Sequence, residues 1–180
     1  MKMRPAGLSI LTIGYGAYIV VSASFMLQVN MWLTSAVGDP FLARAFWVGA
    51  SVALAFSAVY ALTLRAGAVR LVAVLCIFAL AYLVGRWQAY FAEKTHILTY
   101  GLLGYLAARD LAGAEARAGA GGIAGAAGAL KAVACVALVS ACDETFQLLL
   151  PYRFGDLKDF ATNIASGALG IALLFALRGE

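Results

Sequence analysis

The chain has 180 residues, of which 64% are hydrophobic and 12% are charged, with a formal net charge of +4. Water-soluble domains usually carry about 25% charged residues, so this composition excludes a soluble globular protein. Its 13 lysines and arginines stand singly at the ends of apolar runs, which excludes the clustered basic surface of a nucleic-acid-binding protein. We therefore predict a single all-α integral membrane domain over residues 1–180, with membrane lipids as its surroundings and no nucleic-acid partner.

Six apolar segments approach or reach the length of about 20 residues that a helix needs to cross a bilayer. The predicted spans are residues 8–29, 41–64, 69–90, 95–108, 130–150 and 160–177. The first follows a basic N-terminus and is longer than the apolar core of about 7–15 residues in a signal peptide, so we expect it to be retained. The fourth is short, which predicts that its helix extends back through Glu93 or lies tilted and half-buried. The fold class is thus a bundle of about six transmembrane helices.

Residues 113–129, GAEARAGAGGIAGAAGA, are predicted to form a loop of small residues between the fourth and fifth spans. A fifth span that starts directly after this loop places Lys131 at a membrane interface, where its ammonium group reaches water. Counted back from Pro151 at 1.5 Å per residue, Asp143 and Glu144 then lie about 10 Å inside the end of the span.

The basic residues also predict an orientation, because cytoplasmic ends of spans carry an excess of lysine and arginine. With the N-terminus inside, the cytoplasmic ends carry Lys2, Arg4, Arg65, Arg70, Arg109, Arg117, Lys131 and Arg178. The opposite side carries Arg44, Arg86, Lys94, Arg153 and Lys158. This excess predicts that both termini are cytoplasmic and that the ends near residues 93 and 153 face outward.

Polar residues gather in three stretches at the predicted outer ends: EKTHILTY (93–100), DETFQ (143–147) and RFGDLKDFATN (153–163). Within each stretch the spacing places polar side chains on one helix face. The three faces carry Glu93, His96 and Tyr100; Asp143 and Gln147; and Asp156, Asp159 and Asn163. Gly167 and Gly170 continue the last face and allow close approach of another helix. Because an ionisable group within a span costs roughly 2.5–3.5 kcal/mol, we expect the three faces to meet around one polar pocket.

The order and spacing of these residues resemble those of the VanZ-like family of bacterial membrane proteins, which is named after a protein associated with resistance to the lipoglycopeptide teicoplanin. The pattern is formed by His96 and Tyr100, Asp143, Glu144 and Gln147, Pro151 and Arg153, Asp156 and Asp159, and Asn163 and Gly167. It covers residues 93–177 and leaves residues 1–92 as three spans of no recognised family. Glu93 is not part of the family pattern. The resemblance implies a multi-pass protein of a bacterial inner (plasma) membrane, and the family name reports a phenotype rather than a reaction.

The carboxylates favour acid/base chemistry, because hydrolysis of a glycosidic bond needs one protonated and one ionised carboxylate. Burial beside a like charge favours such a division. We therefore predict a membrane-embedded enzyme that hydrolyses or modifies a lipid-linked glycan or glycolipid head group at the outer leaflet. The expected acid/base residues are Asp143, Glu144, Asp156, Asp159 and His96. The expected substrate-binding residues are Glu93, Tyr100, Gln147, Arg153 and Asn163.

Other readings of the same residues stay open. The carboxylates are also consistent with a structural ion-pair network that includes Arg153, Lys158 and Arg86, or with a single Mg²⁺ or Ca²⁺ held through oxygen atoms. No metal or other cofactor is required by the hydrolytic reading. A non-enzymatic protein that binds a lipid-linked precursor or excludes a glycopeptide is the main alternative. A small proton-coupled carrier is a third possibility.

Overall fold

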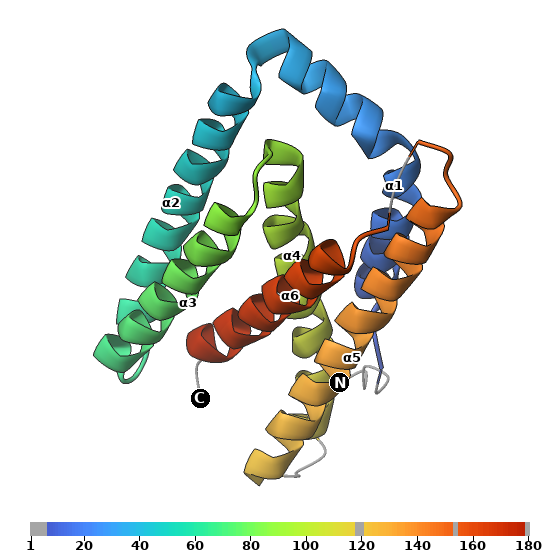
Figure 1. Cartoon of the computed structure of the whole chain (residues 1–180). Coiled ribbons are helices and arrows are strands. Elements are labelled where there is room, and N and C mark those ends of the chain that lie inside the picture. Colours follow the sequence, from blue (N-terminus) through green and yellow to red (C-terminus); the bar gives the residue numbers. More distant parts are fainter. Residues whose placement is uncertain (1–6, 118–120, 153–154, 179–180) are drawn as a thin grey trace.

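The computed structural model describes residues 7–117, 121–152 and 155–178, and all of their side chains except those of residues 113–117 and 121–124. The described chain forms the predicted bundle of six helices (Figure 1). They are α1 (Ile10–Val37), α2 (Asp39–Thr63), α3 (Gly67–Trp87), α4 (Phe91–Arg117), α5 (Gly121–Leu148) and α6 (Leu157–Leu177). Five of them, all but α4, contain a window long and apolar enough to cross a membrane.

Hydrogen bonds between helix ends show that successive helices alternate in direction. At one end of the bundle, the Ser9 N–H that precedes α1 donates to Asp110 near the end of α4 at 2.8 Å. At the same end, Arg70 of α3 donates to a backbone carbonyl of α6. At the opposite end, the Phe91 N–H that opens α4 donates to Asp39, which opens α2, at 3.0 Å. The start of α1 and the end of α6 therefore lie on the same side of the bundle (Figure 1).

Helix α4 occupies the middle of the bundle, where it contacts all five other helices. Its central residues are buried, among them Tyr100, Leu103 and Ala107, each at most 1% exposed. As expected, the helix extends back through Glu93, beginning at Phe91. Its neighbours cover most of it and leave Leu98 and Leu102 as its exposed large side chains, which explains how a helix of low hydropathy is accommodated among five apolar ones.

Glycine residues bring α4 and α6 into backbone contact, the most extensive contact between any two helices. A Cβ atom at Gly104 would overlap the backbone of Gly167, and one at Gly170 would overlap the carbonyl of Gly101. This confirms that Gly167 and Gly170 form a face of close helix approach. Such small-residue contacts are typical of helix packing in membranes, where dispersion contacts between backbones replace the hydrophobic effect.

The predicted loop over residues 113–129 is wrong, because α4 continues to Arg117 and α5 already begins at Gly121. The stretch is rich in alanine, the best helix former, and Gly128 within it serves helix packing. A Cβ at Gly128 would meet the Cα of Ala112 at 2.6 Å, so this glycine allows α5 to approach α4 closely. Lys131 therefore lies within α5, more than two turns after its first residue.

The outer surface of the bundle is strongly apolar. Helices α2 and α3 expose most of their large hydrophobic side chains, such as Phe56, which is 75% exposed. Exposed apolar surface on this scale is incompatible with water and requires a lipid surrounding. Together with the five candidate spans, it identifies a multi-pass membrane protein.

The close approach of α4 and α6 makes a prediction that a pair of identical substitutions tests. We expect Gly170→Ala to lower the thermal unfolding temperature in detergent, because overpacking a well-packed contact costs about 1–3 kcal/mol. Gly49→Ala, in α2, meets nothing within 4 Å and should leave that temperature unchanged or raise it slightly, since alanine favours helix. The unfolding temperatures can be measured by tryptophan fluorescence. Equal changes in temperature for the two variants would contradict the backbone contact between α4 and α6.

Candidate functional site

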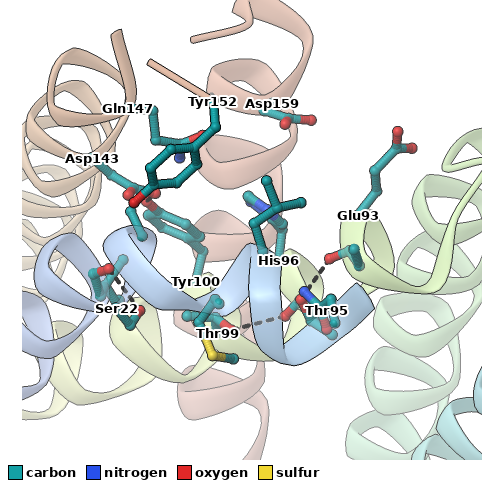
Figure 2. A pocket seen from close by; sticks show the side chains of 16 residues that line it. Ser22, Glu93, Thr95, His96, Thr99, Tyr100, Asp143, Gln147, Tyr152 and Asp159 are labelled. Atoms are coloured by element: carbon teal, nitrogen blue, oxygen red, sulfur yellow. Dashed lines mark hydrogen bonds between the residues drawn. The ribbon is translucent and has the colours of Figure 1, made fainter. Parts of the chain in front are cut away.

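A polar cavity of ≈ 300 Å³ lies between α1, α4, α5 and the start of α6 (Figure 2). It is lined by polar side chains from four helices and the α5–α6 connection and by apolar side chains mainly from α1. The polar ones are Ser22, Asn30, Glu93, Thr95, His96, Thr99, Tyr100, Asp143, Gln147, Tyr152 and Asp159. The expected polar faces of α4 and α5 meet at this cavity, whereas the third face contributes Asp159 but not Asp156 or Asn163.

Asp143 forms a buried part of the cavity wall, with only 4% of its surface exposed. Its Oδ2 atom accepts a hydrogen bond of 2.7 Å from the hydroxyl of Tyr100, which is 1% exposed. Its Oδ1 atom is buried and has no hydrogen-bond partner among the described residues. A buried carboxylate oxygen without a partner is costly, so this atom marks a position where a ligand donor would be stabilising.

Glu144, the sequence neighbour of Asp143, points elsewhere and is not part of the cavity lining. Its Oε2 atom accepts the backbone N–H of Asp156 at 3.0 Å, and its Oε1 atom is 3.4 Å from the side-chain nitrogen of Asn163. Both oxygens are therefore occupied in holding the start of α6 against α5. Neighbours on a helix point about 100° apart, which explains why the two adjacent carboxylates do not face the same space.

Asn163 joins three helices through a single buried amide. Its nitrogen donates to the Ser140 hydroxyl at 2.9 Å and faces Glu144, while its oxygen lies 2.7 Å from Nδ1 of His96. Because the amide oxygen is an acceptor, Nδ1 of His96 must carry a hydrogen. In the neutral imidazole, Nε2 is then the acceptor nitrogen, so the amide fixes the tautomer of a cavity-lining histidine.

Three carboxylates surround the start of α6, each with a different setting. Glu93 forms an ion pair of 3.1 Å with Lys158 and accepts a hydrogen bond from the backbone N–H of Ala89. Asp156 is exposed and caps the N-terminus of α6 through the Lys158 N–H. Asp159 lines the cavity and makes no hydrogen bond or ion pair with a described residue. Of these, Glu93 and Asp159 face the same space as Asp143.

Some lining residues were not predicted from the sequence, because they carry no unusual signal there. Ser22 and Asn30 lie in α1, a helix that we interpreted only as a span, and Tyr152 resembles an ordinary interface aromatic. Tyr152 donates its hydroxyl to the carbonyl of Ser24 at 2.8 Å and so ties the end of α5 to α1. Arg153, expected at the mouth of the pocket, lies outside the described residues.

The basic residue Lys94 is a further difference from the expected pattern. It was placed among the outward basic residues, yet it is only 8% exposed. Its ammonium group donates to the backbone carbonyl of Gln88 at 2.6 Å, which binds the α3–α4 connection to the start of α4. Lys94 is not part of the cavity lining.

Within the described residues, no group of three or more histidine, cysteine, aspartate or glutamate side chains is arranged to hold a metal ion. The four carboxylates that were considered together as cation ligands are divided by the fold. Asp143 and Asp159 line the cavity, whereas Glu144 is engaged with backbone and amide groups and Asp156 caps a helix.

The fold and the site together define a multi-pass α-helical membrane protein with an acidic, partly open cavity near one end of its bundle. The model of the VanZ/LLP1 family matches residues 15–178, and the chain therefore belongs to that family. The match includes most of the first three helices as well as the polar motifs of the second half. Neither the curated proteins nor the solved structures contain a significant match to the chain.

The different settings of the two adjacent carboxylates predict different effects of removing their charge. In Glu144→Gln, one of the two donors that face this side chain must meet an amide NH₂ instead of an oxygen, so we expect a loss of about 1–3 kcal/mol in unfolding free energy. In Asp143→Asn, the amide oxygen still accepts from Tyr100, and the NH₂ group takes the position of the unpartnered oxygen. Its unfolding temperature should stay close to that of the parent.

Both variants can be compared by thermal unfolding in the same detergent. A larger loss in Asp143→Asn than in Glu144→Gln would show that the assignment of the two side chains is reversed.

Proposed function

We propose that this chain binds the polar head group of a lipid-borne molecule, such as a glycolipid or a lipid-linked glycan, in the cavity beside Asp143. The observation that carries the proposal is the buried Oδ1 atom of Asp143, which has no partner among the described residues. An ionisable group in a membrane bundle is expensive and normally faces a partner or a functional cavity. A hydrogen-bond donor on a head group would supply the missing partner.

The size and lining of the cavity agree with such a ligand. Ligand sites usually have volumes of about 300–1,000 Å³, and this cavity is at the lower end of that range. It therefore fits a small head group rather than an extended oligosaccharide. The apolar residues Ile19, Ala23, Met26 and Leu27 of α1 form the remaining wall and would contact the non-polar part of the same molecule.

Hydrolysis of a bound glycolipid is a second candidate function, favoured by the presence of Asp143 and Asp159 in one cavity with His96. Two carboxylates on either side of a glycosidic bond are the usual machinery of glycoside hydrolysis. In this hypothesis Asp159, rather than Glu144, is the partner of Asp143. His96 would accept a proton at Nε2, because Asn163 engages Nδ1.

The binding proposal can be tested with purified protein in nanodiscs that contain either glucosyl diacylglycerol or phosphatidylglycerol with the same acyl chains. We expect tighter binding of the glycolipid, and Asp143→Ala should weaken it by about 10-fold or more, because a hydrogen bond to a charged group contributes about 1.5–3 kcal/mol. Asp156→Asn is the matched control, since asparagine caps a helix as well as aspartate and the residue lies outside the cavity. Equal binding of both lipids would refute recognition of a sugar head group.

The same preparation with labelled sugar tests hydrolysis separately. Hydrolysis would be supported if the parent protein releases glucose and Asp159→Asn still binds the glycolipid but releases none. Binding without release identifies a binding protein.

We further propose that the protein lies in a bacterial plasma membrane with both termini cytoplasmic and the cavity near the outer face. The distribution of basic residues supports this orientation: eight of the 13 are at the predicted cytoplasmic ends, and of these Arg65, Arg70 and Arg109 lie at the end opposite to the cavity. A C-terminal fusion to green fluorescent protein should therefore fluoresce in a bacterial host, and a C-terminal fusion to alkaline phosphatase should be inactive. An active phosphatase fusion, together with a green fluorescent protein fusion that does not fluoresce, would show the opposite orientation.

A further inference from the structure

We infer that the head group bound in this cavity carries a primary ammonium group, which Asp143 Oδ1 and Asp159 recognise. The inference rests on the proposed function and adds the chemical class of the ligand. It is carried by two independent features of the cavity: the direction of its hydrogen bonds and its balance of charge.

Most hydroxyl groups in the cavity wall have already donated their hydrogens to the protein. The hydroxyls of Ser22, Thr95 and Thr99 donate to backbone carbonyls of their own helices, at 2.8, 2.6 and 2.9 Å. The hydroxyl of Tyr152 donates to the carbonyl of Ser24, and that of Tyr100 donates to Asp143. These five groups can offer a ligand only their oxygen lone pairs.

The histidine and the carboxylates add further acceptors. Nδ1 of His96 is engaged by Asn163, so Nε2 is an acceptor whenever the ring is neutral. Asp143 Oδ1 is buried without a donor, and Asp159 has no hydrogen bond to a described residue. The amides of Asn30 and Gln147 also line the cavity and add N–H donors. Acceptors still outnumber donors in the described lining, so the complementary ligand must be rich in donors.

The charge of the lining distinguishes an ammonium group from a neutral hydroxyl. Three carboxylates line the cavity, and its described lining includes no lysine or arginine. Of the cations near the cavity, Lys158 is paired with Glu93, and Lys94 donates to the backbone carbonyl of Gln88. A phosphate or carboxylate in this space would be repelled, whereas an ammonium group offers three donors, no acceptor and a compensating charge.

Two kinds of membrane molecule supply this chemistry: glycolipids with an unacetylated amino sugar, and phospholipids with an amine in the head group. A competition experiment separates them. Nanodiscs contain the protein and equal parts of glucosaminyl, N-acetylglucosaminyl and glucosyl diacylglycerol with identical acyl chains. A second set contains phosphatidylethanolamine and phosphatidylglycerol. Native mass spectrometry then measures which lipid stays bound.

We expect the bound glucosaminyl lipid to exceed the acetylated and neutral lipids about 10-fold, as expected for the loss of one charge-assisted hydrogen bond. Asp143→Asn should abolish this preference but still bind the glucosyl lipid, which shows that the variant is folded. Asp159→Asn should reduce the preference, and Asp156→Asn should retain it. A preference for phosphatidylethanolamine over phosphatidylglycerol that depends on Asp143 would support the inference and identify a phospholipid amine as the source.

Equal occupancy by the three glycolipids, with no preference between the two phospholipids, would overturn the inference while leaving the proposed function in place. If no glycolipid binds and neither phospholipid is preferred, the proposed function fails as well. A preference that persists in both Asp143→Asn and Asp159→Asn would place the ammonium group elsewhere and would also overturn the inference.

Discussion

The buried amide of Asn163 is the interaction on which the rest of the site depends. It is 0% exposed and connects Ser140 and Glu144 of α5 with His96 of α4. In a bundle surrounded by lipid, each of these polar groups would be costly alone, and together they satisfy one another. The network can form only because glycine residues allow α6 to lie against α4 at backbone distance. Helix packing and polar chemistry are therefore two aspects of the same contact.

This arrangement divides the acidic residues between structural contacts and the lining of the cavity. Glu144 and Asp156 hold the start of α6 in place, the first by accepting from its backbone and the second by capping the helix. Asp143 and Asp159 are left to face the cavity, in a space whose other hydroxyl groups have already donated their hydrogens to the protein. The result is a preformed acceptor surface inside an apolar protein. The chain belongs to the VanZ/LLP1 family, and the ligand that we propose for it is inferred from the chemistry of the cavity alone.

The sequence was sufficient to predict the membrane class, the six helices and the convergence of the polar faces, because hydrophobic length and helical spacing are local properties. It was also sufficient to predict the role of Gly167 and Gly170. It failed over residues 113–129, where small residues suited to close packing were interpreted as a loop. It could not show that Asp143 and Glu144 have different settings, because that depends on where α6 begins in space. Ser22 and Asn30 gave no signal, since a polar residue in a span becomes part of a site only through its neighbours.

The central claim is that Asp143 Oδ1 is the point at which the cavity holds its ligand. A crystal structure of the protein grown in a lipidic mesophase that contains glucosaminyl diacylglycerol tests this claim most directly. The account predicts density for the head group between α1 and α4, with a donor atom within hydrogen-bond distance of Asp143 Oδ1. Head-group density confined to the apolar cavity of ≈ 350 Å³ between α2, α3, α4 and α6, with the space beside Asp143 unchanged, would contradict it.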